Sequence, residues 1–421
     1  MRATRMFTGR KSRWPLFDFA SLLLAAVLLA PTAGAQIDPV RRDLLEIGYS
    51  GPLQGSAPVA AFGYYYLNRP EWLRPNLTLR LVVTPLYVDG ELGIRGVFGP
   101  RTDLGIGLSG GGFAYSYDEI HKGDWLRDQS FAGHGGGASL SLYHLFNPGE
   151  LIPLNGVLRG SFSYASYVRS SRNPEDFALP PNQPVATLRA GIRFGGEEPR
   201  MAPPFAMELS AWYEGQLRFS PGAYGFDGDR LVERLVHKVW GRALLNYTLA
   251  DSRHRLTLGV VAGTSIHPDR LSAYRVGGLF TLASEFPLVL PGYFVNELSA
   301  RSLVLMGAAY SLPLEPTRQW VLTAGGNTAR IDYTPGLEQP GAWNTGVGVG
   351  LTYLSQSKSW KTSLSYGYGF DAIRGDHRGG NALSIQVEID LQRKGGAAAG
   401  PSSSDFFERV IRLLRALSSN G

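Results

Sequence analysis

The chain of 421 residues contains 53 glycines, 20 tyrosines and no cysteine, and its formal net charge is +6. Its length alone would accommodate two or three soluble domains, but this abundance of glycine and aromatic residues is typical of repeated short strands. The absence of cysteine excludes disulfide frameworks, thiolate zinc sites and cysteine nucleophiles.

The positive charge is concentrated at the two ends of the chain. Residues 1–35 hold five basic residues and one acidic residue, and residues 393–421 hold five basic and two acidic residues. Residues 36–392 are therefore close to neutral. Because the basic character is an end effect, we predict no nucleic-acid partner.

Residues 1–35 have the three parts of a secretory signal peptide. A basic stretch that includes Arg10 and Lys11 precedes an apolar run from Phe19 to Ala30, and Ala33-Gly34-Ala35 follows. We predict cleavage after Ala35, with the mature chain beginning at Gln36. The alternative is an uncleaved membrane anchor, but the apolar run is shorter than the roughly 20 residues that a spanning helix needs.

After this segment, apolar and polar residues alternate in short stretches. From Trp360 to Asp371 the even positions are mainly apolar or aromatic, and from Leu383 to Leu391 the odd positions are apolar. Such stretches are typical of transmembrane β-strands. Because hydrocarbon cannot form hydrogen bonds with backbone groups, a sheet in lipid must close on itself.

The pattern predicts an all-β fold, a sixteen-stranded antiparallel transmembrane β-barrel over residues 36–393. The outer membrane of a bacterium is then the expected location, with its lipid as a partner. The predicted strands are Leu44–Ser50, Ala57–Leu67, Asn76–Val88, Gly90–Phe98, Asp103–Ser116, Ala132–Phe146, Gly156–Val168, Pro184–Phe194, Phe205–Phe219, Val236–Ala250, Arg255–Ile266, Ser302–Leu314, Trp320–Arg330, Trp343–Leu354, Trp360–Asp371 and Ala382–Gln392.

The connections between these strands alternate between short and long, as expected for periplasmic turns and outer loops. The longest is the sixth outer loop, His267 to Arg301. One connection departs from the alternation, because Val88-Asp89-Gly90 should be an outer loop but has the sequence of a tight hairpin.

Within the sixth loop, Gly277-Gly278 precedes Pro291-Gly292-Tyr293, and the apolar strand from Ser302 to Leu314 follows. This order, over about 40 residues, resembles the surface-antigen superfamily of outer-membrane barrels, which includes barrel-assembly, two-partner-secretion and patatin-linked barrels. The resemblance implies a barrel with a translocation or membrane-insertion role. Only about ten residues precede the first strand after Gln36, so we expect neither the periplasmic repeats nor the patatin-like domain of that family.

Two positions depart from the family pattern. The arginine at the tip of the family's loop is replaced by Pro291, and the acidic residue expected on the thirteenth strand is replaced by Thr323. Loss of both partners indicates a divergent, repurposed barrel, in which the fold carries over better than the activity.

Charged residues opposite the apolar strand faces need water or a partner, which a lumen supplies. We therefore predict that these residues face the lumen: Glu208, Glu214, Arg218, Lys361, Asp371, Glu388 and Asp390.

Residues 394–421 form a separate region. A linker rich in glycine, alanine, proline and serine precedes a stripe of apolar residues at helical spacing, opposite Arg409, Arg412 and Arg415. The pattern predicts an amphipathic helix from about Ser404 to Leu417. It would lie on the inner leaflet, dock a periplasmic protein partner or pack against the periplasmic mouth of the barrel.

Several motifs imitate catalytic sites. Gly105, Gly107 and Gly110 match a dinucleotide-binding pattern, and residues 107–111 match a nucleophile elbow, but both lie in an alternating strand with no helix after it. The histidines, among them His144 near Asn147, show no metal-ligand or catalytic spacing. We predict no enzyme activity, no metal site and no cofactor.

Three functions remain, with a translocation or pore-type barrel that carries an in-folded sixth loop as the leading one. The first alternative is a non-catalytic anchor or scaffold whose tail recruits a periplasmic partner. The second is a lipid hydrolase embedded in the barrel. Conductance in a planar bilayer separates the first two, and hydrolysis of a fluorogenic phospholipid identifies the third.

Overall fold

The computed structural model describes residues 37, 40–58, 60–148, 150, 152–196, 205–249, 252–279 and 286–392. The predicted signal peptide and the predicted C-terminal linker and helix lie outside these residues. No helix in the described part of the chain is long and apolar enough to cross a membrane.

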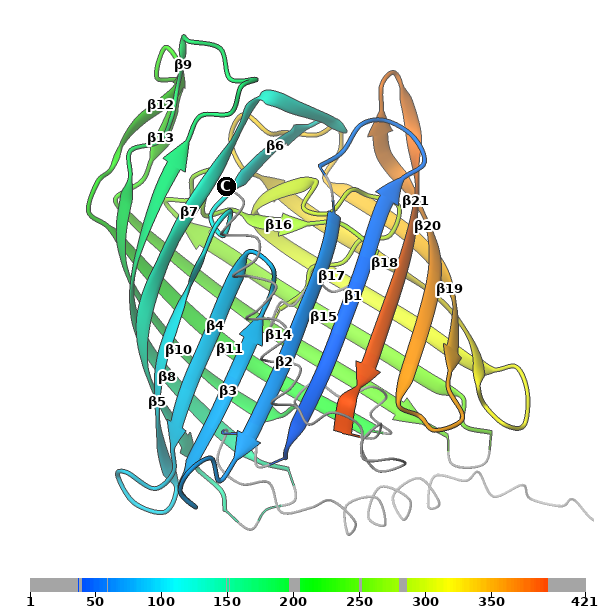
Figure 1. Cartoon of the computed structure of the whole chain (residues 1–421). Helices are drawn as coiled ribbons and strands as arrows, with labels where there is room; N and C mark the ends of the chain where they lie inside the picture. Colours follow the sequence, from blue (N-terminus) through cyan, green and yellow to red (C-terminus); the bar gives the residue numbers. More distant parts are fainter. Residues whose placement is uncertain are drawn as a thin grey trace, which may run out of the picture.

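Sixteen strands form a single closed wall (Figure 1), which confirms the predicted fold. Each strand pairs antiparallel with its neighbours along the chain, and β1 pairs with β21 over nine residues, from Leu44↔Asp390 to Pro52↔Ala382. The wall strands are β1 (Arg42–Pro52), β2 (Ala60–Pro70), β3 (Leu77–Val83), β4 (Tyr87–Ile94), β5 (Thr102–Gly111), β7 (Asp124–Leu145), β8 (Leu154–Val168), β10 (Gln183–Gly195), β11 (Phe205–Arg218), β14 (Leu235–Thr248), β15 (Arg255–Ile266), β17 (Leu298–Pro313), β18 (Trp320–Tyr333), β19 (Trp343–Leu354), β20 (Trp360–Arg374) and β21 (His377–Asp390).

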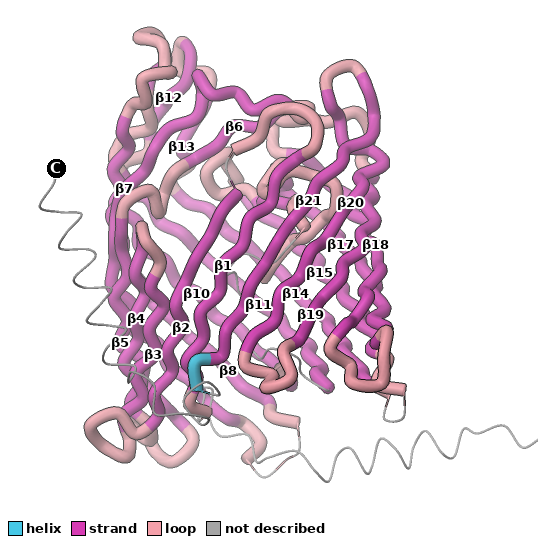
Figure 2. The backbone as a smooth tube through the Cα atoms, turned by 45° about the vertical axis from the view of Figure 1, so that its right-hand side comes forward, coloured by secondary structure: helices cyan, strands magenta, loops and turns pink. Residues whose placement is uncertain are grey.

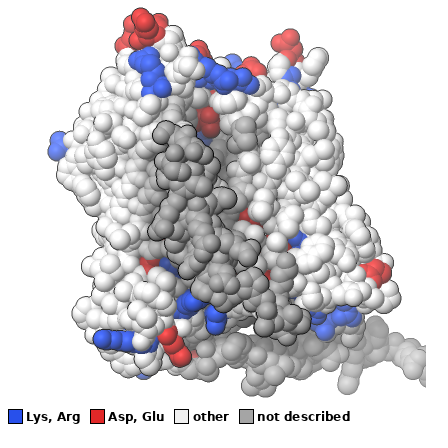
Figure 3. Space-filling model, in the orientation of Figure 1, with Lys and Arg blue, Asp and Glu red and all other residues white. Residues whose placement is uncertain are grey.

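Alternating side chains give each wall strand two different faces. On β20, Leu364, Tyr366 and Phe370 are exposed, and the residues between them are smaller or polar. We call the side opposite the exposed apolar residues the polar face of a strand. In Figure 3, Lys, Arg, Asp and Glu gather mainly near the two ends of the wall, and the described surface between the ends is mostly uncharged.

The two ends of the barrel differ in their connections. Short turns join the strands at one end, which Figure 1 shows at the bottom, and most of the long loops are at the other. The long loops hold β6 (Tyr117–His121), β9 (Phe177–Ala178), β12 (Gly222–Phe226), β13 (Arg230–Val232) and β16 (Tyr274–Val276). Figure 2 shows β6, β12 and β13 at the long-loop end of the wall.

The long loops are packed together by their own small core. Its buried side chains are Tyr117, Phe131, Phe177, Tyr224 and Val232. The carboxylate of Glu119 lies among them and accepts hydrogen bonds from Arg270 and from the Tyr117 hydroxyl. Because a buried charge is stable only when paired, these contacts hold the loops in one arrangement.

The predicted hairpin at Val88-Asp89-Gly90 was wrong. The turn lies at residues 84–86, where the Thr84 amide donates to the Tyr87 carbonyl at 2.8 Å. The Thr84 hydroxyl accepts a hydrogen bond from the Leu86 amide at 3.3 Å, so the threonine side chain stabilises the turn. Asp89 and Gly90 instead lie inside β4, opposite Val82 and Leu81.

Several predicted strand ends also move. β7 begins at Asp124, earlier than the predicted Ala132, because its first part pairs with β6 above the wall. β21 begins at His377 and ends at Asp390, so the predicted last apolar position, Leu391, lies just beyond the strand. These shifts arise from pairing partners that alternation within one strand does not specify.

Candidate functional site

The connection between β15 and β17, residues 267–297, is the candidate site, and we call it the β15–β17 loop. Gly277 donates to the Leu288 carbonyl at 2.9 Å, and Gly278 forms an isolated bridge with Leu290. The loop therefore folds back on itself between these points. Gly277, Gly278 and Gly292 have φ values of 142°, 95° and 82°, which favour glycine and explain its presence at these predicted positions.

The tip of the loop lies against a strip of glycines on β19 and β20. A Cβ atom added to Gly346 would stand 2.0 Å from the Pro291 carbonyl oxygen, and one added to Gly292 would stand 1.9 Å from the Gly369 nitrogen. Only glycine allows the two backbones to approach this closely. The strip comprises Gly346, Gly348, Gly367 and Gly369, all on the polar face.

Next to this strip, the loop buries apolar side chains against the polar face of β17 and β18. Tyr293 of the loop is 1% exposed and donates to the Asn344 side-chain oxygen at 3.3 Å. Each large aliphatic side chain buried this way contributes about 1.5–3 kcal/mol. The cluster is formed by Val276, Leu290, Tyr293, Leu298, Ala300, Leu303, Leu305, Ala329, Ile331 and Ala372.

A buried ion pair joins the base of the loop to the wall. Arg374, the last residue of β20, donates to both carboxylate oxygens of Glu297 at 2.9 Å and to the Gly292 carbonyl at 3.1 Å. Its guanidinium lies 3.7 Å from the ring centroid of Phe294. The two charged side chains are 4% and 1% exposed, so each depends on the other for compensation.

This ion pair reverses the arrangement that the resemblance implies. The loop supplies the acid and the wall supplies the arginine, whereas Pro291 and Thr323 stand at the two family positions. Thr323 shares a hydrogen bond with Ser311 at 2.9 Å, away from the tip. Neither Glu297 nor Arg374 is among the predicted site residues, because a single acid and a single arginine 77 residues apart carry no local pattern.

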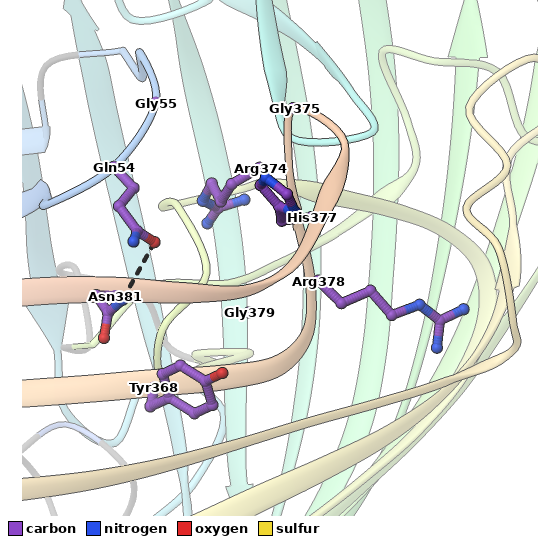
Figure 4. A pocket seen from close by; sticks show the side chains of 9 residues that line it. All are labelled: Gln54, Gly55, Tyr368, Arg374, Gly375, His377, Arg378, Gly379 and Asn381. Carbon is purple, nitrogen blue, oxygen red and sulfur yellow. Dashed lines mark hydrogen bonds between the residues drawn. The ribbon is translucent and has the colours of Figure 1, made fainter.

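A hollow of about 490 Å³ adjoins the ion pair, near the long-loop ends of β1 and β21. Asn381 donates to the Gln54 side chain across it at 3.1 Å. The Arg374 and Arg378 side chains extend in different directions (Figure 4). The hollow is lined by Gln54, Gly55, Tyr368, Arg374, Gly375, His377, Arg378, Gly379 and Asn381.

On the other side, the loop reaches β11 and β14. Phe286 lies edge-on to Trp212 and Trp240, with ring centroids 5.3 and 5.4 Å apart. Trp212 occupies the same face of β11 as Glu208 and Glu214, because all three are at even positions. Three wall strands, β15, β17 and β18, lie between β14 and β19. The loop thus contacts two separate parts of the wall.

The predicted charged residues on β11 are all buried and ion-paired. Glu214 accepts from Arg189 at 2.6 Å, and Glu208 lies 3.8 Å from Arg193. Arg218 pairs with Asp269 of the β15–β17 loop. Their exposed neighbours on β11 are Leu209, Tyr213 and Leu217.

The predicted charged residues on β20 and β21 form a second group. Lys361 lies 2.7 Å from Glu388. Asp371 accepts from the Thr345 amide at 3.0 Å, and Asp390 accepts from the Gln392 amide at 3.0 Å. The seven predicted residues therefore lie along two parts of the wall, β11 and β20–β21, with separate partners, and their access to water stays a prediction.

The motifs that imitate catalytic sites lie in strands. The glycines of residues 105–111 pair with β4 and β7 inside β5. His144 shares a hydrogen bond with Thr102 at 2.8 Å, whereas Asn147 bonds to the backbone of Ile152 and Leu154. Among the described residues, no group of three or more His, Cys, Asp or Glu side chains could hold a metal ion.

No family model and no curated protein sequence matches this chain. Solved structures do match. CdiB from Acinetobacter baumannii aligns with a TM-score of 0.52 and 12% identity, over 83% of this chain and 60% of that chain. BamA from Haemophilus ducreyi lacking POTRA domains 1–3 aligns with a TM-score of 0.51 and 11% identity, over 88% and 78%. CdiB from Escherichia coli aligns with a TM-score of 0.50 and 12% identity, over 84% of this chain and 64% of that chain.

This chain has the fold of those barrels. The predicted resemblance in fold is confirmed, and at this identity the likeness concerns the fold alone. The chain spans about 60% of the CdiB chain from Acinetobacter baumannii.

Proposed function

We propose that the protein is a translocation or pore-type barrel of the bacterial outer membrane, whose pathway is closed by the β15–β17 loop folded into the lumen. The observation that carries the proposal is the pair of contacts that the loop makes with two parts of the wall. Phe286 meets β11 and β14, and Pro291 and Gly292 meet β19 and β20. A loop that touches both parts and packs on β17 and β18 between them takes up part of the space that the wall encloses.

The location follows from the wall. Large apolar side chains such as Leu209, Leu364 and Ile385 are exposed on one face of their strands, and charged side chains occupy the other. Lipid suits the first face, and a hydrated lumen suits the second. A resemblance to translocation and assembly barrels supports the same placement, and the loop then acts as a plug held by the Arg374–Glu297 ion pair.

The test is conductance in a planar lipid bilayer. Replacing residues 279–289 with two glycines removes the Phe286 contact with β11 and β14, and the bridge between Gly278 and Leu290 places the joined ends close together. Because a sixteen-stranded barrel is wide enough to leave an aqueous channel, the shortened variant should show a large steady conductance that the complete chain lacks. A shortened β17–β18 turn, without residues 316–318, is the control, because this turn is at the opposite end of the barrel from the loop, and it should stay closed.

A shortened barrel that keeps heat-modifiable gel mobility but does not conduct would contradict the proposal and favour the anchor or scaffold function. In that case the C-terminal region, residues 394–421, becomes the segment to test for a periplasmic partner. Hydrolysis of a fluorogenic phospholipid by the complete chain would favour the embedded hydrolase instead.

A further inference from the structure

Trp212 and Trp240 form an aromatic seat on the polar face of β11 and β14. The two residues are directly opposite in the strand register, their ring planes are 11° apart and their centroids are 6.3 Å apart. Phe286 of the β15–β17 loop places its phenyl ring edge-on to both indoles. The seat therefore already holds one six-membered aromatic ring, supplied by the protein itself.

The seat also carries hydrogen-bond donors that the protein does not use. Trp212 and Trp240 are 3% and 7% exposed, and the indole N–H of each is buried without a hydrogen-bond partner. A buried donor left unsatisfied costs about 1–3 kcal/mol, so two on adjacent strands call for an explanation. The phenyl ring of Phe286, which packs on both indoles, offers no acceptor oxygen.

Cations surround the same two indoles. Arg189 lies over the Trp240 ring at 5.6 Å, and Arg193 lies over the Trp212 ring at 5.5 Å. Lys238 is on the same face of β14, two residues from Trp240. On this face of β10, β11 and β14, the described cations are Arg189, Arg193, Arg218, Lys238 and Arg242, and the described carboxylates are Glu208 and Glu214. Asp269 of the loop pairs with Arg218. The local formal charge is positive.

We propose that this seat is a binding site for an aromatic carboxylate, and that Phe286 occupies it in the absence of ligand. The aromatic ring of the ligand takes the place of the Phe286 phenyl group. Its carboxylate accepts hydrogen bonds from the indole N–H groups and is attracted by the neighbouring cations, as charge-assisted bonds require. A neutral aromatic molecule lacks the attraction between the carboxylate and the cations, and a carboxylate without a ring lacks the packing against the indoles.

Binding at the seat competes with the loop and not with the wall. The apparent affinity is reduced by the fraction of molecules in which Phe286 fills the seat, so removing that side chain should increase it. The site does not require that the barrel conducts, because binding can be measured on the folded protein in detergent. Failure of the conductance experiment and failure of this one are therefore distinguishable.

The experiment is calorimetric titration of the purified, heat-modifiable barrel with phenylacetate. Phe286→Ala should bind phenylacetate about tenfold more tightly than the unaltered chain. Acetate and benzyl alcohol should each bind Phe286→Ala at least tenfold more weakly than phenylacetate does, by about 1.4 kcal/mol. On the Phe286→Ala background, Trp212→Leu and Trp240→Leu should each weaken binding, and Trp343→Leu, at the exposed start of β19, should not.

Three results would overturn the site. They are equal binding of benzyl alcohol and phenylacetate, no binding by a folded Phe286→Ala barrel, and an equal loss from Trp343→Leu and Trp212→Leu. Because a tryptophan variant can fail to fold, Lys238→Gln is the second test. It should weaken phenylacetate binding and leave the weak binding of benzyl alcohol unchanged, and an equal effect on both ligands would also count against the site.

Discussion

The polar face of the barrel wall has two contrasting regions. From β8 to β14 it carries large charged and aromatic side chains, such as Arg159, Glu214 and Trp240, held by ion pairs and ring contacts. From β17 to β20 it carries mainly glycine, hydroxyl groups and apolar residues, such as Gly346, Ser365 and Leu303. The β15–β17 loop contacts both regions in different ways.

The difference explains how the loop is held. Against the glycine-rich region the loop lies backbone to backbone, because no Cβ atoms intervene at Gly346 and Gly369. Against the charged region the start of the loop is held by the ion pair between Asp269 and Arg218, and a later part reaches β11 and β14 through the Phe286 side chain. Close backbone packing and the Arg374–Glu297 ion pair anchor the loop on the glycine-rich side, and the Phe286 contact is the one that a ligand can replace.

The largest expected effect concerns the Arg374–Glu297 ion pair. Arg374→Ala leaves the Glu297 carboxylate buried without its cation, which should lower the stability of the folded loop by about 3–5 kcal/mol. Hydrogen–deuterium exchange measures this loss as faster exchange of the amides of residues 288–298. The amides of the wall strands should stay protected from exchange.

Arg378→Ala is the matched control, because this arginine lies on the same hairpin but its side chain is 62% exposed. A double variant, Arg374→Met with Glu297→Leu, should recover part of the loss because neither charge remains buried. Unchanged exchange in Arg374→Ala would mean that the glycine-rich region holds the loop without the ion pair.

On the outer face of the wall, a charged substitution should have a similar cost on β11 and on β21, although the polar faces of the two regions differ. Leu209 on β11 and Ile385 on β21 are 62% and 49% exposed. Lysine at either position places a charge in lipid and should cost about 2–4 kcal/mol near the midplane. Urea titration of heat-modifiable gel mobility compares the two, and Ile389→Lys, nearer the short-turn end, should cost less. Very unequal costs for Leu209→Lys and Ile385→Lys would show that the two outer faces differ in lipid contact.

Alanine in the glycine strip should separate loop packing from strand formation. Gly346→Ala places a methyl group about where the Pro291 carbonyl oxygen lies, and such overpacking costs about 1–3 kcal/mol. The expected result is faster proteolysis within the β15–β17 loop at unchanged barrel mobility on gels. Gly160→Ala on β8 is the control, because a Cβ atom there meets nothing within 4 Å. Equal proteolysis of the two variants would argue against the close contact at Pro291.

The smallest expected effect concerns the reactivity of single cysteines introduced on either face of a strand, which should leave the stability of the barrel unchanged. Cysteine at Ser363 or Gln386 should react with small water-soluble thiol reagents, whereas cysteine at Leu364 or Val387 should resist them, because alternate residues face opposite sides of the wall. Labelling rates measured by mass shift decide between the faces. The opposite pattern would invert the assignment of the polar face to water.

The strands and their closure could be predicted because each depends on local information. Alternation along β20 or β21 predicts which face of the strand contacts lipid. Because every backbone N–H and C=O group in lipid needs a hydrogen-bond partner, the sheet is also predicted to close. All sixteen predicted wall strands correspond to wall strands of the structure. The turn at Thr84 was missed because Asp89-Gly90 has stronger turn chemistry in isolation, and pairing of β3 with β4 overrode it.

The candidate site divides in the same way. The sequence by itself determined that glycines stand at residues 277, 278 and 292 and that charges alternate with apolar residues along each strand. Only the tertiary structure decided that Glu297 meets Arg374, that Pro291 lies on a strip of glycines and that Phe286 reaches Trp212 and Trp240. The physical reason is that these contacts join residues far apart in the chain, whose proximity is set by barrel closure and strand register and leaves no periodic signal in the sequence.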